Sequence, residues 1–273
     1  MRWLYRTREK ALSVTDDQLV RIFQLMDSQR HLPNYKLELR AAPFFEFFLP
    51  DILYRSLKGH PRIDESAVIP EFPLDDKSRH KVDYVVFGEK EKPIGKLTPY
   101  FVELKTDMEY FLPTQIVDYA KRAKDDFACM MKKNVIGRVK RTDTTPRRQK
   151  YAHLLRRLTS PPGPDIVTLP QKDIFETTFP PNKKGWSNAR RNVKVNNEIK
   201  FAPIEVVVLL PKKEHPKVDK LKGELKHINA TVHFIDFCEV ANLVETRGGL
   251  GCIFATYLRK WTKRAGIAQI VWQ

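Results

Sequence analysis

The spacing of apolar and polar residues along the chain predicts alternating helices and strands. Near the N-terminus, TDDQLVRIFQLM repeats apolar residues three and four positions apart, behind a capping box of Thr15 and Gln18, which is typical of an amphipathic helix. A second helix is predicted to begin at Pro43, a favoured first-turn position, and to continue through FFEFFLPDILYRSL. The N-terminal part of the chain is therefore expected to be helical.

Strands are predicted at AVIPEF, KVDYVVF and PYFVELK, and the polar, glycine-containing GEKEKPIGKLT between the last two favours a hairpin. A long helix is expected next, from Pro113 to Lys133. Its predicted core stripe is Ile116, Ala120, Ala123, Phe127 and Met130. Further along, IEVVVLL indicates a central strand, VDKLKGELKHI a helix, TVHFIDF another strand, and EVANLV to LRKWTK closing helices. This order predicts an α/β fold with a central mixed β-sheet flanked by helices.

The length of 273 residues and the apolar content of 42% suffice for one large domain with an insertion. We expect an N-terminal helical segment at 1–35, an α/β core formed by 36–131 and 203–273, and a basic, proline-rich insertion at 132–202. No apolar run approaches the roughly 20 residues of a membrane span, and the N-terminus lacks the apolar core of a signal peptide, so we expect a soluble, cytoplasmic protein without a membrane partner. The three separated cysteines predict reduced, mostly buried thiols without a functional role.

Positive charge is concentrated in one segment. The chain carries 49 Lys and Arg against 33 Asp and Glu, a net charge of +16, and the segment from Lys132 to Lys200 contributes +12 of it. Basic side chains follow a phosphate backbone, and aromatic rings such as those interspersed here stack on bases, so the segment predicts a nucleic-acid surface. The residues expected to contact nucleic acid are Lys140, Arg141, Arg147, Arg148, Arg190 and Arg191. The alternative is a solvated loop whose charge serves solubility.

Charged residues interrupt two of the predicted strands. In YFVELKTD, Glu103 and Lys105 point to the same face, and Asp83 lies in KVDYVVF. The residues predicted to share the face of Asp83 are Lys81, Val85 and Phe87. Hairpin neighbours on one face approach within about 5.5 Å, and two carboxylates that close repel each other unless a cation lies between them. A hard divalent metal such as Mg²⁺ fits there, with Lys105 placed to orient water and to neutralise charge on a phosphate.

The tripeptide alone is a weak signal, because Glu-x-Lys also occurs at Glu198 and at Glu224. Glu224 lies in a helical pattern, where residues two apart do not share a face. Glu198 lies on the polar side of an ordinary half-exposed strand pattern. Only Glu103 follows a strand that bears an aspartate and precedes a long helix.

That helix carries a further polar group. In PTQIVDYAKR, Gln115 and Tyr119 are four residues apart and share a face, with Arg122 one turn further on. An amide, a phenol and a guanidinium aligned in this way can contact a scissile phosphate or a base. The alternative is a helix surface that faces water.

Taken in the order strand, strand, helix, Asp83, Glu103-Leu104-Lys105 and the glutamine-to-tyrosine pair resemble the PD-(D/E)xK nuclease superfamily. The spacing of the glutamine and the tyrosine is similar to the RecB-like exonuclease branch. The resemblance implies a restriction-endonuclease-like core, in which Mg²⁺ or Mn²⁺ is held by Asp83, Glu103 and the carbonyl of Leu104. It also implies that Lys105 is the catalytic lysine.

The resemblance covers roughly residues 43–133 and the strand near Val207. Val82 stands where the family pattern has proline, and the separation of the two carboxylates requires a protruding hairpin. The family often carries an acidic residue on the helix before the sheet, and Glu46, flanked by phenylalanines, is the candidate, with Glu38 in reserve. A buried carboxylate needs a partner, which a metal would supply. The alternative is that Glu46 reaches solvent.

These features predict a metal-dependent nuclease that hydrolyses phosphodiester bonds, and the RecB-like spacing favours DNA over RNA. Two alternatives stay open at this point. The chain is a nucleic-acid-binding protein on a nuclease-derived fold without catalysis, or it is a subunit that cuts only within a larger protein complex. A homodimer would let two sites cut two strands.

Overall fold

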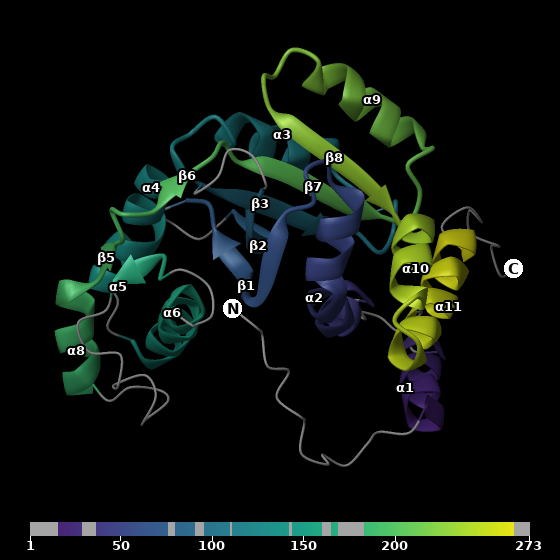
Figure 1. The fold of residues 1–273 in the computed structure, drawn as a ribbon, viewed down its shortest axis with the longest axis horizontal. Helices are drawn as coiled ribbons and strands as arrows, with labels where there is room; N and C mark the ends of the chain where they lie inside the picture. The colour runs from purple at the N-terminus through teal and green to yellow at the C-terminus, as the bar shows by residue number, and fades with distance from the viewer. Residues whose placement is uncertain are drawn as a thin grey trace, which may run out of the picture.

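The computed structural model describes residues 16–28, 37–75, 80–90, 96–109, 111–141, 144–159, 165–168 and 183–264. Its centre is a mixed, curled β-sheet with the strand order β1-β2-β3-β7-β8 (Figure 1). The strands of this order are β1 (Arg62–Pro73), β2 (Lys81–Glu89), β3 (Lys96–Leu104), β7 (Glu205–Leu210) and β8 (Thr231–Asp236). The first three strands are antiparallel, whereas β3, β7 and β8 are parallel. The short β6 (Lys200–Phe201) extends the parallel pairing of β3.

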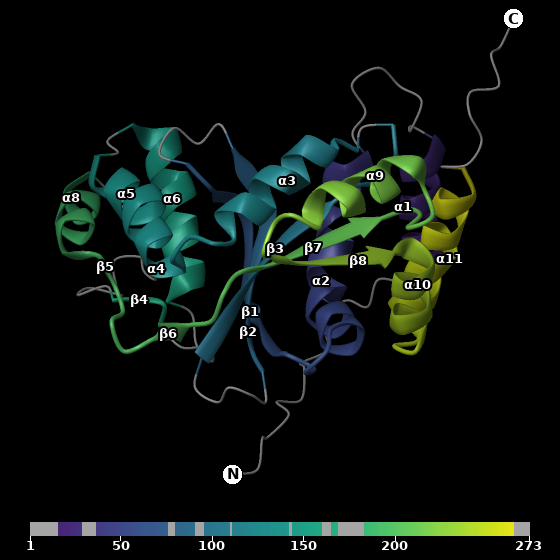
Figure 2. The same ribbon diagram turned by 90° about the horizontal axis from the view of Figure 1, so that it is seen from above.

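Helices cover both faces of the sheet, which confirms the predicted α/β architecture. The elements that cover the first face are α3 (Pro113–Arg122), α4 (Phe127–Met130), the π-helix η1 (Met131–Ile136), α5 (Gly137–Arg141), α6 (Thr145–Leu158), α8 (Lys183–Asn192) and α9 (Pro216–Leu225). The second face is covered by α1 (Asp16–Ser28), α2 (Leu37–Ser56), α10 (Phe237–Glu245) and α11 (Gly249–Arg264). Figure 2 shows α4, α5, α6 and α8 gathered at one end of the molecule and α10 and α11 at the other.

Aromatic side chains fix α1 to the second face. Phe23 is fully buried, and its ring stacks on Tyr257 with centroids 4.8 Å apart and on Phe254 at 5.9 Å. The predicted amphipathic helix is therefore present and shares the core of the second face. The capping residue Thr15 lies outside the described residues.

The second helix begins earlier than its proline suggests. It starts at Leu37 and passes through both Pro43 and Pro50, so the prediction that Pro43 opens the helix is wrong. Each proline removes one hydrogen bond from the helix interior. The buried stripe along α2 compensates, because it belongs to the apolar cluster that α2 shares with the sheet, α10 and α11. The residues of this stripe are Leu37, Ala41, Phe45, Phe48, Leu49, Ile52 and Leu53.

The predicted long helix from Pro113 to Lys133 is broken in the structure. The segment α3 ends at Arg122, and a new helix begins after Asp126, whose side chain accepts a 2.7 Å hydrogen bond from the backbone N–H of Cys129. Asp126 is thus the N-cap of a separate helix, four residues beyond the end of α3. The predicted apolar stripe is nevertheless buried at all five of its positions.

Much of the basic segment is helical and packs on the first face. Within the described parts of 132–202, buried side chains of α6 and α8, among them Tyr151, Leu155 and Trp186, belong to the same apolar cluster as the sheet. A two-stranded sheet of β4 (Val167–Thr168) and β5 (Lys194–Val195) closes the segment. The strand predicted around Glu198 is divided, because β5 and β6 are separated by a turn.

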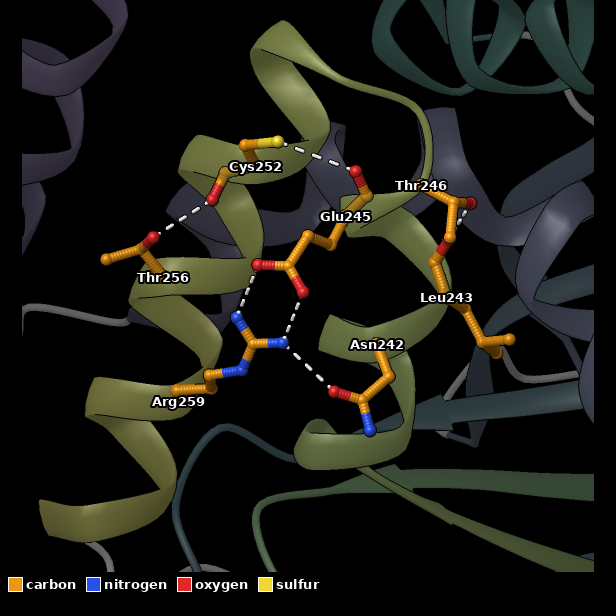
Figure 3. Close-up of polar contacts among 7 residues, drawn as sticks. All are labelled: Asn242, Leu243, Glu245, Thr246, Cys252, Thr256 and Arg259. Carbon is orange, nitrogen blue, oxygen red and sulfur yellow. Dashed lines mark hydrogen bonds and ion pairs between the residues drawn. The ribbon is translucent and has the colours of Figure 1, made fainter.

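A helical hairpin of α10 and α11 closes the second face (Figure 3). Arg259 donates to both carboxylate oxygens of Glu245, at 2.8 and 2.7 Å, and to the side-chain oxygen of Asn242 at 2.9 Å. Gly251 allows the two helices to meet, since a Cβ atom there would lie 2.1 Å from the carbonyl oxygen of Val244.

The expectation of buried thiols is wrong. The cysteines Cys129, Cys238 and Cys252 are all free and exposed. Each lies on a helix whose buried face is filled by larger apolar side chains, so the thiols occupy the outer faces.

None of the helices in the described part of the chain combines the length and the apolar character that a membrane span requires.

Candidate active site

Asp83 and Glu103 face each other across neighbouring strands. The pairing of β2 with β3 joins Tyr84 to Val102, and one further step in the same register brings Asp83 opposite Glu103. The predicted hairpin is therefore present, and the two carboxylates influence each other. Burial, and then the charge of Asp83, raise the pKa of Glu103 to about 7. Two acids in this arrangement do not both ionise readily near neutral pH.

The backbone of β3 holds Asp83. Its Oδ2 atom accepts a 2.8 Å hydrogen bond from the N–H of Leu104. Burial raises the pKa of Asp83, and this hydrogen bond opposes the rise. The Asp83 carboxylate is thereby fixed at the end of the β2–β3 ladder, beside Glu103.

Strand alternation is lost next to Asp83. Val85 and Phe87 lie in the apolar cluster of the first face. Strict alternation would place Val82 on the opposite face, but Val82 belongs to the same cluster. The face predicted for Lys81, Asp83, Val85 and Phe87 is therefore not a simple alternating one. On β1, Glu71 has φ of 50°, in the left-handed region that a non-glycine residue rarely adopts. Ile69 and Phe72, on either side of Glu71, both lie in this cluster, so the alternation is interrupted on β1 as well.

Lys105 pairs directly with Glu103. Its Nζ atom lies 2.6 Å from Oε1 of Glu103, and the side chains are only 11% and 1% exposed. Burial would lower the pKa of Lys105, but the Glu103 carboxylate outweighs burial and raises it. The backbone N–H of Lys105 donates to the carbonyl of Leu209 at 2.8 Å, so the central strand β7 fixes this end of β3.

Gln115 and Tyr119 complete the surroundings of Glu103, as their spacing on α3 predicts. The Gln115 amide donates to Glu103 Oε1 at 2.8 Å and to the Tyr119 hydroxyl at 2.6 Å. The Tyr119 hydroxyl lies 2.6 Å from the carbonyl oxygen of Lys81 and 3.0 Å from Oε2 of Glu103. It has one proton for two acceptors, so a proton on Glu103 would let every group in this set be satisfied.

Arg122 lies on the same helix but makes a different contact. Its Nη1 atom donates to the carbonyl oxygen of Leu74 at 2.9 Å, and the Asn134 amide donates to the same oxygen at 2.7 Å. With Lys133, these residues line a cavity of about 430 Å³. This contact of Arg122 ties α3 to the chain after β1.

The two acidic candidates on α2 lie on either side of Tyr84. The Tyr84 hydroxyl donates to the carbonyl oxygen of Ala42 at 3.0 Å, and Ala42 is one turn from both Glu38 and Glu46. Burial, followed by the charges of Glu46, Asp83 and Glu38, raises the pKa of Tyr84. Three carboxylates therefore gather around one phenol, which sequence reasoning missed although Tyr84 directly follows Asp83.

The two acids have different partners. Glu46 is partly exposed, and its Oε1 atom pairs with Nη2 of Arg157 at 3.1 Å. The charge of Glu38 contributes to the raised pKa of Lys105. Glu38 therefore acts electrostatically on the lysine that pairs with Glu103, while Glu46 contacts Arg157 of α6.

The basic residues predicted to bind nucleic acid are spread over three helices of the described segment. Those on α5 are Lys140 and Arg141, those at the start of α6 are Arg147 and Arg148, and those on α8 are Arg190 and Arg191. Two cations that were not on that list, Lys150 and Arg157 of α6, make the contacts nearest the carboxylates, through Glu71 and Glu46. A charge count could not find them, because it does not show which face of α6 meets the sheet.

Comparisons with protein-family models, with curated proteins and with solved structures give no match. The architecture and the contacts around Glu103 are therefore the basis for any functional interpretation.

Oxygen donors are present for a metal, but they are engaged. Asp83 and Glu103 supply the hard carboxylate oxygens that Mg²⁺ and Mn²⁺ take, and a cation between them would relieve their repulsion. Within the described ranges, no group of three or more His, Cys, Asp and Glu side chains is arranged to hold a metal ion. The oxygen donors fit a metal ion when Lys105 and Tyr119 release their contacts with the Glu103 carboxylate.

Proposed function

We propose that the protein is a metal-dependent nuclease that hydrolyses phosphodiester bonds, with DNA as the favoured substrate. The observation that carries this proposal is the buried Glu103, which faces Asp83 across the strand pair and holds Lys105 at 2.6 Å. Buried carboxylates that have raised pKa values and lie beside a lysine are found at catalytic sites more often than elsewhere.

A restriction-endonuclease-like core is part of the same proposal. The order α2, three antiparallel strands, α3 and then a parallel central strand supports it. So does the location of the polar groups, which lie at the ends of β2 and β3 and on the first helix that follows.

The protein groups have separate roles in this proposal. Mg²⁺ or Mn²⁺, bound by Asp83, Glu103 and the carbonyl oxygen of Leu104, would supply a Lewis acid and an activated water. Lys105 contributes an ammonium group that orients the nucleophile and balances charge on the phosphate. Gln115 and Tyr119 hold the Glu103 carboxylate in place. A third carboxylate would come from α2, where Glu46 and Glu38 both lie near Tyr84.

The experiment is cleavage of single- and double-stranded DNA and RNA with Mg²⁺, with Mn²⁺ and with EDTA. Lys105→Ala should abolish metal-dependent cleavage and leave binding in EDTA largely intact. The chain supplies a matched control, because Glu224-Leu225-Lys226 repeats the tripeptide at the end of α9 with an exposed lysine. Lys226→Ala should cut like the parent. Equal activity in the two variants would show that Lys105 is not the catalytic lysine.

A nucleic-acid-binding protein without catalysis is the second candidate. The contacts of Lys105, Gln115 and Tyr119 with Glu103 favour it, because they engage both oxygens of the carboxylate. Salt-dependent binding without cleavage in either metal would support this candidate instead.

A further inference from the structure

Three acidic residues lie in a row across three strands. The pairing of β1 with β2 joins Pro70 to Tyr84 and Phe72 to Val82, which places Glu71 opposite Asp83, just as Asp83 lies opposite Glu103. Neighbouring strands are about 4.8 Å apart, so Glu71 lies one strand spacing outside the Asp83–Glu103 pair. It belongs to β1, the edge strand of the sheet.

Two lysines share this outer carboxylate. Nζ of Lys81 lies 2.9 Å and Nζ of Lys150 lies 3.3 Å from the same atom, Oε2 of Glu71. The hydrogen bond from Lys81 lowers the pKa of Glu71. Burial, followed by the charge of Lys81, lowers the pKa of Lys150. Two ammonium groups on one carboxylate leave an excess of positive charge next to the candidate active site.

This cluster is accessible to a ligand. The side chain of Glu71 is 63% exposed, and those of Lys81 and Lys150 are 37% and 32% exposed. Exposed ion pairs contribute little to stability, so these lysines can exchange their carboxylate for another anion at small cost. A phosphate group, which two lysines can approach together, is such an anion.

The cluster is also connected to the catalytic groups. The carbonyl oxygen of Lys81 accepts from the Tyr119 hydroxyl that contacts Glu103, and the charge of Glu71 contributes to the raised pKa of Asp83. Lys150 comes from α6, which lies beside β1 in Figure 1. The same helix carries Arg157, two turns further on, which pairs with Glu46 of α2. The cationic face of α6 therefore runs along the edge of the sheet past the site.

We propose that Lys81 and Lys150 bind a phosphate group of the substrate strand, next to the phosphate group that lies at Asp83 and Glu103. The bound phosphate competes with Glu71 for the two lysines. The inference rests on the proposed function for the identity of the ligand. Among the helices of the basic segment, α6 is then the one that binds the substrate beside the cleaved bond.

The test uses opposite substitutions at one ion pair. Binding of short fluorescein-labelled DNA, single- and double-stranded, is measured by anisotropy in EDTA over a series of KCl concentrations. Lys150→Gln should weaken binding roughly tenfold. It should also lower the slope of log K against log salt by the value of one phosphate contact, about 0.9 on double-stranded and about 0.7 on single-stranded DNA. Glu71→Gln breaks the same ion pair but removes the competing carboxylate, so it should strengthen binding about threefold.

A second ion pair serves as the control. Lys222 and Asp219 on α9 are 3.6 Å apart and exposed, so Lys222→Gln and Asp219→Asn repeat the two charge changes elsewhere. Neither should change the affinity by more than the small shift expected from net charge alone. Thermal unfolding of all four variants shows whether each remains folded.

The outcomes separate the inference from the proposed function. If the ion pair has a purely structural role, Lys150→Gln and Glu71→Gln should change the affinity for DNA in the same direction. That result would overturn the phosphate site, and so would effects no larger than those of the α9 pair. Neither result would affect the conclusion drawn from cleavage by the parent protein. Opposite effects on affinity in a protein that cleaves no substrate would support the phosphate site and contradict the proposed nuclease activity.

Discussion

Asp83 and Leu104 are joined side chain to backbone, at the point where the ladder between β2 and β3 ends. The 2.8 Å hydrogen bond from the Leu104 N–H gives the Asp83 carboxylate a fixed position, although the pairing of main chains has stopped. Leu104 lies between Glu103 and Lys105, so one short contact aligns an acid on β2 with the acid on β3 and with the lysine that directly follows β3. This arrangement makes the electrostatics of Glu103 testable.

Replacement of Glu103 should flatten the dependence of stability on pH. Its pKa is about 7 in the fold against an ordinary value of 4.5, so between these pH values the folded chain binds more protons than the unfolded chain. Stability from this group is therefore full below about pH 4.5 and is lost as the pH rises through 7, a decline of about 3 kcal/mol. Glu103→Gln should abolish that decline in thermal unfolding measured in EDTA. The exposed Glu224→Gln should keep the parental slope.

Glu205 should show the opposite dependence. Burial alone would raise its pKa, but hydrogen bonds from His233 at 2.9 Å and Lys90 at 2.5 Å lower it below its ordinary value. Its contribution is present above about pH 4.5 and is lost as the pH falls through the lowered pKa. Glu205→Gln should cost about 1 kcal/mol in urea unfolding at neutral pH, after allowance for screening by solvent, and less in acid. An equal loss at both pH values would contradict this.

Tyr119→Phe should separate positioning from packing. The ring stays in the core, but the Lys81 carbonyl and the Gln115 amide lose a partner, so unfolding free energy should fall by about 1–2 kcal/mol. Since Glu103 is then less well oriented, kcat for the proposed cleavage reaction should fall roughly 10- to 100-fold with little change in KM. Tyr54→Phe is the control, because Tyr54 is exposed on α2. A change in KM alone would contradict a positioning role.

Gly251→Ala should open the α10–α11 hairpin. The new Cβ would lie 2.1 Å from the Val244 carbonyl, in backbone that cannot move without separating the helices. The expected loss is about 3 kcal/mol or more in urea unfolding. Gly223→Ala on α9 is the matched control, since nothing lies within 4 Å of its Cβ position, and alanine there should be neutral or stabilising. Similar losses in the two variants would rule out the close approach as the cause.

The parts of the fold that depend on local pattern could be predicted from the sequence. Strand alternation and a polar connector between two apolar runs sufficed for the β2–β3 hairpin, and the convergence of Asp83 and Glu103 followed from it. The spacing of Gln115 and Tyr119 was likewise enough to place both on Glu103, because a helix fixes residues four apart on one face.

Other features depend on contacts between distant parts of the chain. The helix through Pro43 is stabilised by packing on the sheet, which outweighs a local signal for a helix start. The left-handed backbone of Glu71 has no marker in its sequence, yet it lies where the alternation is interrupted on β1. Lys150 reaches Glu71 only because α6 packs along β1, so composition identified a basic segment without showing which of its cations meet the site.

The order of the sheet has a consequence for how the chain reaches its native state. The strands β1, β2 and β3 follow one another and pair through short connections, whereas the parallel neighbour of β3 is β7, about 100 residues later. Closing so long a loop is entropically costly and slows folding. The hairpins are therefore expected to form first, with one edge of β3 unpaired. Lys105 is then fixed only when β7 pairs with β3 and the Leu209 carbonyl accepts the hydrogen bond from the Lys105 N–H. The site should be among the last regions to gain protection in pulse-labelled hydrogen exchange.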